Sequence, residues 1–224
     1  MYELFYNSAL ISIIQIIAID IILGGDNAIV IALACKNLPE KKRKLGIFYG
    51  ALGAIILRVI MVFCATTLLA IPYLKIGGGL LLIWIGVKLI LDNQTSHDVN
   101  VKQESNLLAA IKTIIIADFV MSLDNSVAIA AVANGDIPLV IFGLLLSVPI
   151  IIWGSSLILK LIDRYPVIIY IGAILIGWIG GDMIQSDLYI TSRNISFYSD
   201  KLLPTLCMAF VLIYSLLYNN YKKR

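Results

Sequence analysis

Long apolar stretches recur along the chain, and each is bounded by charged residues, proline or a polar segment. A bilayer core about 30 Å thick needs roughly 20 mostly apolar residues in a helix, and the stretches reach that length repeatedly. The ten-residue alternation typical of a membrane β-barrel does not occur. The pattern therefore predicts an all-α membrane protein of about seven transmembrane helices in a single domain. The predicted spans are 9–34, 45–70, 73–91, 107–133, 138–162, 166–184 and 203–219.

Composition agrees with a membrane environment and restricts the chemistry. Apolar residues make up 60% of the chain, charged residues 14%, and the mean hydropathy is +0.96. The apolar fraction and the mean hydropathy exceed those typical of a soluble domain, and the charged fraction is lower. Three widely spaced cysteines and the single histidine, His97 in a polar stretch, give little material for a disulfide framework or a His/Cys metal site. We expect no organic cofactor.

The basic residues predict the orientation in the membrane. Lys41, Lys42, Arg43 and Lys44, between the first two spans, form the densest basic cluster. The positive-inside rule places that cluster in the cytoplasm, which puts the N-terminus outside and the C-terminus in the cytoplasm. The net charge of +3 then reflects topology, and the lipid bilayer is the expected partner with no role for nucleic acid.

Two parts of the chain repeat the same polar motif. Asp20 precedes Asp26-Asn27 with the spacing by which Asp118 precedes Asp124-Asn125. A second match follows. Gly86 comes fourteen residues after Pro72, as Gly180 does after Pro166, and a tryptophan lies two residues before each of these glycines. Three helices per copy would insert the second copy in the opposite direction, as in many secondary transporters. The predicted parts are repeat one at 9–91, a cytoplasmic linker at 92–106, repeat two at 107–184, an external loop at 185–202 and an extra helix at 203–219.

The four aspartates are expected to face a polar interior, because a charge at helix centre costs at least about 2.5–3.5 kcal/mol on insertion. With Leu23 and Met121 taken as the midplane, antiparallel helices would present two carboxylate pairs, one above the other. Asp20 would pair with Asp124 toward the outer side, and Asp26 with Asp118 toward the inner side.

A regular helix cannot aim Asp20, Asp26 and Asn27 inward together. Gly24-Gly25 lies between them and permits a kink that also frees backbone carbonyls as ligands. Ser122 and Leu123 take the equivalent places in the second copy, so we expect the greater distortion in the first helix.

Carboxylate, amide and carbonyl oxygens are hard ligands that suit Mg²⁺, Ca²⁺ or Mn²⁺. Arg58, near the middle of the second predicted span, is a candidate counter-ion for one aspartate, with a direct role in gating as the alternative. Two close carboxylates do not both ionise readily, so one is expected to hold a proton when no metal is bound. This suggests proton exchange for the metal, because outward movement of a dication costs about 4.6 kcal/mol per 100 mV.

At these motifs the sequence resembles the TerC family, in particular its short seven-helix branch, and the broader lysine-exporter-like superfamily. The residues that carry the resemblance are 20–34 and 118–133, and the resemblance covers nearly the whole chain. It implies manganese efflux across the cytoplasmic membrane of a bacterium, without enzymatic activity. The metal ligands that it implies are Asp20, Asp26, Asn27, Asp118, Asp124 and Asn125.

Several alternatives stay open at this point. Gly24-Gly25-Asp26 has a superficial likeness to the Gly-x-Gly-Asp of intramembrane aspartyl proteases, although that family's Pro-Ala-Leu sequence is absent. The aspartates could also act only in helix packing. Alternatively, the protein could bind metal as a sensor or an accessory to another complex, without transport. The preferred cation, the coupling ion, the oligomeric state, protein partners and the tellurite link in the family's name are not decided by the sequence.

Overall fold

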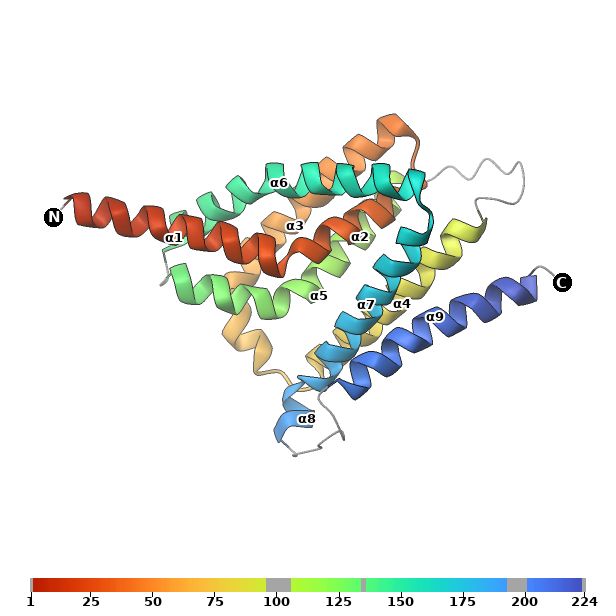
Figure 1. The fold of residues 1–224 in the computed structure, drawn as a ribbon. Coiled ribbons are helices and arrows are strands. Elements are labelled where there is room, and N and C mark those ends of the chain that lie inside the picture. Colours follow the sequence, from red (N-terminus) through yellow and green to blue (C-terminus); the bar gives the residue numbers. More distant parts are fainter. Residues whose placement is uncertain (1, 96–105, 134–135, 193–200, 223–224) are drawn as a thin grey trace.

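The computed structural model describes residues 2–95, 106–133, 136–192 and 201–222, and these residues form helices and connecting turns with no strand (Figure 1). The prediction of an all-α fold is thus confirmed. His97 and most of the predicted linker lie outside the described residues. The helices are α1 (Tyr2–Leu23), α2 (Gly25–Cys35), α3 (Glu40–Leu69), α4 (Leu74–Thr95), α5 (Leu107–Ala133), α6 (Ile137–Arg164), α7 (Val167–Gln185), α8 (Leu188–Ser192) and α9 (Leu202–Lys222).

Helix lengths and composition agree with a multi-pass membrane protein. Among the described residues, four helices are long and apolar enough to cross a bilayer, namely α3, α4, α6 and α7. The bent pair α1 and α2 makes a fifth when it is counted as one span. Large apolar side chains such as Trp153, Phe142 and Ile22 are exposed on the helix exteriors, as a lipid-facing surface requires. The count of seven spans stays a prediction.

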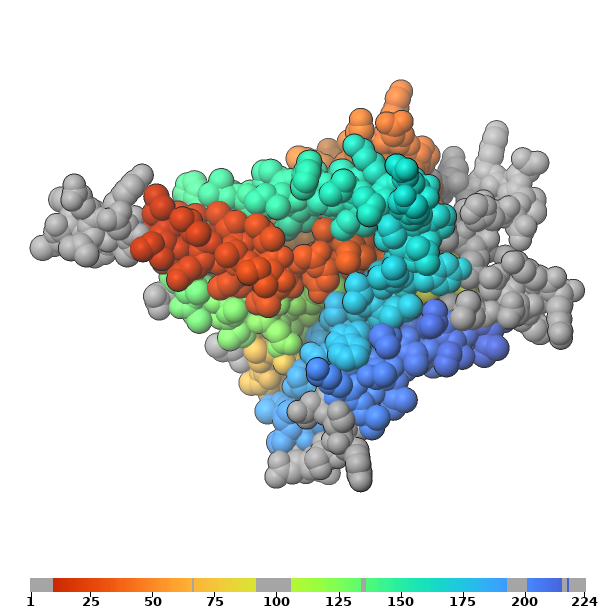
Figure 2. Space-filling view, viewed as in Figure 1, coloured from red at the N-terminus to blue at the C-terminus, as the bar shows by residue number. Residues whose placement is uncertain are grey.

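The helices pack in two groups. In the first, α3 lies along α5, while α6 lies along α1 and α2. Figure 2 shows α1 and α2 as a band between α6 and α5 on one face of the molecule. In the second group, α4 packs along α7 and α7 along α9. The largest buried cluster joins α2 and α5 to the neighbouring helices, and it includes Ile31, Met121 and Leu123.

Asp187, in the predicted external loop 185–202, organises one end of the second helix group. It is fully buried and accepts hydrogen bonds from the backbone N–H groups of Tyr73, Lys75, Ile76 and Tyr189, at 2.8–3.3 Å. These bonds hold Tyr73, whose φ of 67° is unusual for a residue with a side chain, and satisfy N–H groups at the start of α4. Asp187 therefore ties the α3–α4 turn to α8.

The contact between α4 and α7 depends on glycine. A Cβ atom added at Gly79 would lie 2.3 Å from the carbonyl oxygen of Gly180, and one added at Gly180 would lie 2.7 Å from that of Gly79. Backbone atoms cannot move aside as side-chain ends can. Close approach of two helices at small residues is a usual means of association in membranes, where the hydrophobic effect does not drive helices together.

Gly79→Ala is accordingly expected to lower the melting temperature of the purified protein in detergent, because overpacking of this kind costs about 1–3 kcal/mol. Gly77→Ala is the matched control on the same helix, since nothing lies within 4 Å of a Cβ added there. That variant should melt at or slightly above the native temperature. Equal melting temperatures for the two variants would contradict this account of the α4–α7 contact.

Candidate functional site

The first Asp motif lies at a break in the chain's helical path. Helix α1 ends at Leu23, α2 begins at Gly25, and their axes are bent by 53°. A Cβ atom at Gly24 would lie 2.5 Å from the carbonyl oxygen of Asp20, so the close turn needs glycine at this position. The second motif lies inside α5, which continues without interruption. The prediction of greater distortion in the first copy is confirmed.

Around this break one regular helical hydrogen bond persists, while other backbone groups take partners that a continuous α-helix would not give them. The N–H of Gly24 donates to the carbonyl of Asp20 at 2.9 Å, and the N–H of Asn27 donates to that of Gly24 at 3.0 Å. The side-chain amide of Asn125 in α5 donates to the carbonyl of Leu23 at 3.1 Å. Asn125 thus supports the broken helix, and these carbonyls, expected to be available as ligands, accept hydrogen bonds.

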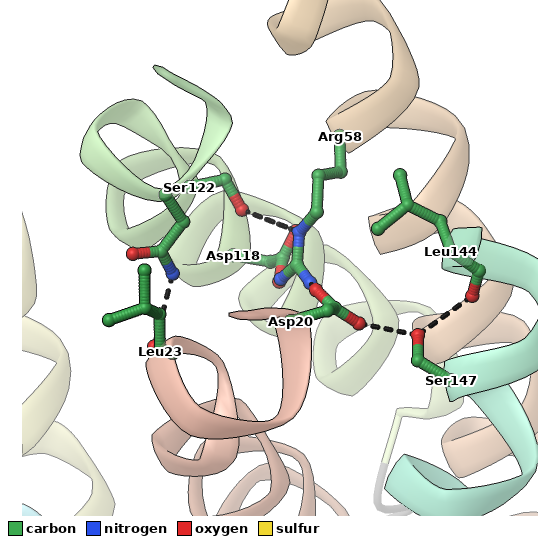
Figure 3. Close-up of polar contacts among 8 residues, drawn as sticks. Asp20, Leu23, Arg58, Asp118, Ser122, Leu144 and Ser147 are labelled. Atoms are coloured by element: carbon green, nitrogen blue, oxygen red, sulfur yellow. Dashed lines mark hydrogen bonds and ion pairs between the residues drawn. The ribbon is translucent and has the colours of Figure 1, made fainter. Parts of the chain in front are cut away.

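Arg58 of α3 lies between two of the predicted aspartates (Figure 3). Its Nη1 contacts Oδ1 of Asp20 from α1, and its Nη2 contacts Oδ1 of Asp118 from α5. The side chains of Arg58 and Asp20 are 2% and 1% exposed, and that of Asp118 is 4% exposed. One guanidinium group therefore bridges the equivalent aspartates of the two motifs inside the helix bundle.

Two serines complete the contacts of these carboxylates. Nε of Arg58 donates to Oγ of Ser122 at 3.0 Å, and this hydroxyl donates to Oδ2 of Asp118 at 3.2 Å. The hydroxyl of Ser147 in α6 contacts Oδ2 of Asp20. Each of the four carboxylate oxygens of Asp20 and Asp118 therefore has a polar partner.

This arrangement corrects the predicted pairing of carboxylates. The sequence predicts Asp20 beside Asp124, but Arg58 joins Asp20 to Asp118 instead, whereas Asp26 lies within electrostatic reach of Asp118. Asp124 is half exposed and pairs with Lys75, with 2.5 Å between Nζ and Oδ1. The physical reason is that the buried carboxylates of Asp20 and Asp118 require a partner charge, which α3 supplies, while α4 brings a lysine within reach of the half-exposed Asp124.

A different set of polar groups near the helix break lacks partners. Within the described part of the chain, Oδ1 of Asp26, both amide atoms of Asn27 and the hydroxyl of Ser126 are buried without a hydrogen-bond partner. Buried polar groups are paired in the great majority of cases, so such a cluster calls for an explanation. Asn27 is 3% exposed and lines two cavities, both of which Asp118 also lines. Arg58 lines one of them.

The charges of this region leave a negative balance. Asp26 lies near enough to Arg58 and Asp118 for their charges to act on its own. With all groups ionised, the carboxylates of Asp20, Asp26 and Asp118 and the single guanidinium give a formal charge of −3 + 1 = −2. One dication would balance that charge. No group of three His, Cys, Asp or Glu side chains with metal-binding geometry occurs among the described residues. The oxygen donors that line the cavities are the carboxylate of Asp118 and the amide of Asn27.

The predicted site residues therefore fall into two sets. Asn27 and Asp118 line the cavities, Asp26 lies within electrostatic reach of Asp118 and Arg58, and Asp20 is linked to Asp118 through Arg58. Asp124 and Asn125 are engaged elsewhere, by Lys75 and by the Leu23 carbonyl. The sequence analysis did not assign roles to Ser122 and Ser147. The position of Ser122 four residues after Asp118 placed it on the same helix face, but no local signal marked Ser147.

Comparisons with known proteins agree with this architecture. The model of the "Integral membrane protein TerC family" matches residues 5–224. The membrane protein YjbE of Bacillus subtilis (strain 168) is 40% identical over 221 residues, which cover 96% of this chain and 98% of the relative. The membrane protein YceF of the same organism is 25% identical over 192 residues, 82% of this chain and 74% of the relative.

A UPF0053 protein of Haemophilus influenzae is 24% identical over 200 residues, with 81% of this chain and 84% of the relative covered. No solved structure matches the chain. The family match spans both Asp motifs and Arg58, and the similarity to YjbE extends over nearly the full length of both proteins. The chain therefore belongs to the TerC family of integral membrane proteins.

Proposed function

We propose that this protein exports a divalent metal ion, with Mn²⁺ as the first candidate, from the bacterial cytoplasm by alternating access. The observation that carries the proposal is that Asn27 and Asp118 line the same cavities, with Asp26 next to Asn27 at the helix break. This group combines hard oxygen ligands, unpartnered polar atoms and a local formal charge of −2 in the helix interior. Such oxygens suit Mn²⁺, Ca²⁺ or Mg²⁺. The broken helix is typical of substrate sites in secondary transporters.

The contacts between helices support the inverted repeat on which alternating access would depend. If the two halves are equivalent, a contact between them should have a counterpart with the roles exchanged. Ile16 of α1 lies against Gly143 of α6, and a Cβ atom added at Gly143 would be 2.5 Å from Cγ2 of Ile16. The equivalent isoleucine, Ile114 of α5, lies against Gly50 of α3, and a Cβ atom added at Gly50 would be 2.5 Å from Cδ1 of Ile114.

The second helix group follows the same rule. Gly79 and Gly180 approach each other between α4 and α7. Their counterparts under the predicted repeat are Ala173 and Gly86, and a Cβ atom at Gly86 would lie 3.0 Å from the carbonyl oxygen of Ala173. Both exchanged pairs support two three-helix units of opposite orientation, with α9 as the extra helix. We propose seven spans, with the N-terminus outside and the C-terminus in the cytoplasm.

Arg58 argues against the protease alternative. An aspartyl protease needs two carboxylates that share one proton. Here the two buried aspartates that face each other across the bundle both contact the same guanidinium. That arrangement favours ion binding and charge balance over peptide hydrolysis.

Efflux is tested by intracellular manganese in cells loaded with Mn²⁺, with the native protein and Asp26→Asn at matched membrane levels. Asp26 takes part in no ion pair with a described residue, so its loss should spare the fold, while removal of a ligand lowers transport at least about tenfold. Asp182→Asn, an exposed acid in α7, is the control and should export like the native protein. If Asp26→Asn lowers intracellular manganese as well as the native protein does, the proposed site is wrong.

Exchange for protons is the second part of the proposal, because outward movement of a dication opposes an inside-negative potential. In everted membrane vesicles with the native protein, an imposed proton gradient should drive Mn²⁺ uptake, and an uncoupler should abolish the uptake. Uptake that is indifferent to the uncoupler would exclude proton coupling and leave the ion site itself unaffected.

A further inference from the structure

Arg58 is held at three points inside the bundle. Its two terminal nitrogens contact Asp20 and Asp118, and its Nε donates to Ser122 at 3.0 Å. Figure 3 shows the side chain extending from α3 into the space between α1 and α5. Arg58 thus joins the two aspartates that occupy equivalent places in the motifs.

The oxygens around Arg58 differ in how they are engaged. Oδ1 of Asp118 contacts Arg58, and Oδ2 accepts from Ser122 at 3.2 Å. The neighbouring amide of Asn27, 3% exposed, lines the same cavity as Arg58 and Asp118 and has no hydrogen-bond partner among the described residues. A cation that binds Asn27 in this cavity therefore lies beside the carboxylate of Asp118, one oxygen of which is engaged by the guanidinium and the other by Ser122.

The guanidinium of Arg58 and a bound dication cannot both contact the carboxylate of Asp118 without electrostatic repulsion. The guanidinium and a dication would repel each other at contact distance, and a buried site with low effective dielectric screens this repulsion weakly. Arg58 has a second carboxylate partner, because its other terminal nitrogen contacts Asp20. The remaining oxygen of Asp20 contacts Ser147. Movement of one side chain toward Asp20 would release Asp118.

We propose that Arg58 is a tethered competitor of the transported dication, which takes Asp118 when the ion leaves and yields it when the ion arrives. This inference rests on the proposed function. A tethered group acts at a high effective concentration, so it lowers the affinity of the site and promotes release of the ion. It also neutralises part of the negative charge after release, which favours the return of the protein for another cycle.

The test measures Mn²⁺ binding to the purified full-length protein in detergent by titration calorimetry. Arg58→Gln removes the competing charge, and its affinity for Mn²⁺ should rise at least about fivefold, the lower end of typical coupling between two sites. Its export of manganese from cells should fall, because the ion no longer leaves readily. Arg58→Lys keeps a cation that cannot bridge both carboxylates, and its affinity should lie between the other two.

Tighter binding together with slower export is an outcome that a merely structural Arg58 would not give. Unchanged or weaker Mn²⁺ binding by a folded Arg58→Gln variant would overturn the proposal. If that variant does not fold, Ser122→Ala serves instead, because it removes the acceptor of Nε and one donor to Asp118. It should bind Mn²⁺ more tightly than the native protein, and weaker or unchanged binding would overturn the proposal.

Asp118→Asn separates this inference from the proposed function. If the native protein binds Mn²⁺ and Asp118→Asn does not, the ion site stands, and the Arg58 variants alone decide the competition. If Asp118→Asn binds as well as the native protein, Asp118 is no ligand and the competition is excluded. If neither the native protein nor any variant binds Mn²⁺ or Ca²⁺, the proposed function itself fails and the competition fails with it.

Discussion

The burial of one guanidinium between two carboxylates is the interaction on which the rest of the structure depends. Charges inside an apolar bundle are tolerated only when they are paired and hydrogen-bonded, and loss of one partner of such a pair costs about 3–5 kcal/mol. Arg58 meets this requirement with contacts to Asp20, Asp118 and Ser122. These contacts join α1, α3 and α5, so the same interaction that makes the aspartates tolerable also fixes the helices around them.

The break between α1 and α2 turns this structural core into a candidate binding site. A continuous helix would pair its own backbone groups, as α5 does around the second motif. At Gly24 the chain turns by 53°, and Asn125 supports the exposed end of α1 while its counterpart Asn27 is left without a partner among the described residues. Loss of symmetry between two similar motifs thus leaves the Asn27 amide without a partner in the cavity that Arg58 lines.

Much of this fold was accessible from the sequence, because hydropathy and helix-breaking residues report directly on apolar helices. The predicted span 107–133 coincides with α5, and the glycine pair indicated where the first helix breaks. The carboxylate partners were not accessible in the same way. Helical periodicity gives the height and face of Asp20 or Asp124 on its own helix, but α3 and α4 decide which basic side chain reaches it. Ser147, which contacts Asp20 from α6, had no local signal for the same reason.

The central claim is that a dication binds beside Asn27 and Asp118. Its most direct test is a crystal structure of the full-length protein grown with Mn²⁺, with anomalous scattering recorded near the manganese absorption edge. The account predicts an anomalous peak within coordination distance, about 2.0–2.6 Å, of oxygen atoms of Asp118 and Asn27. A peak confined to exposed carboxylates such as Asp163 or Asp182, with none beside Arg58, would contradict it.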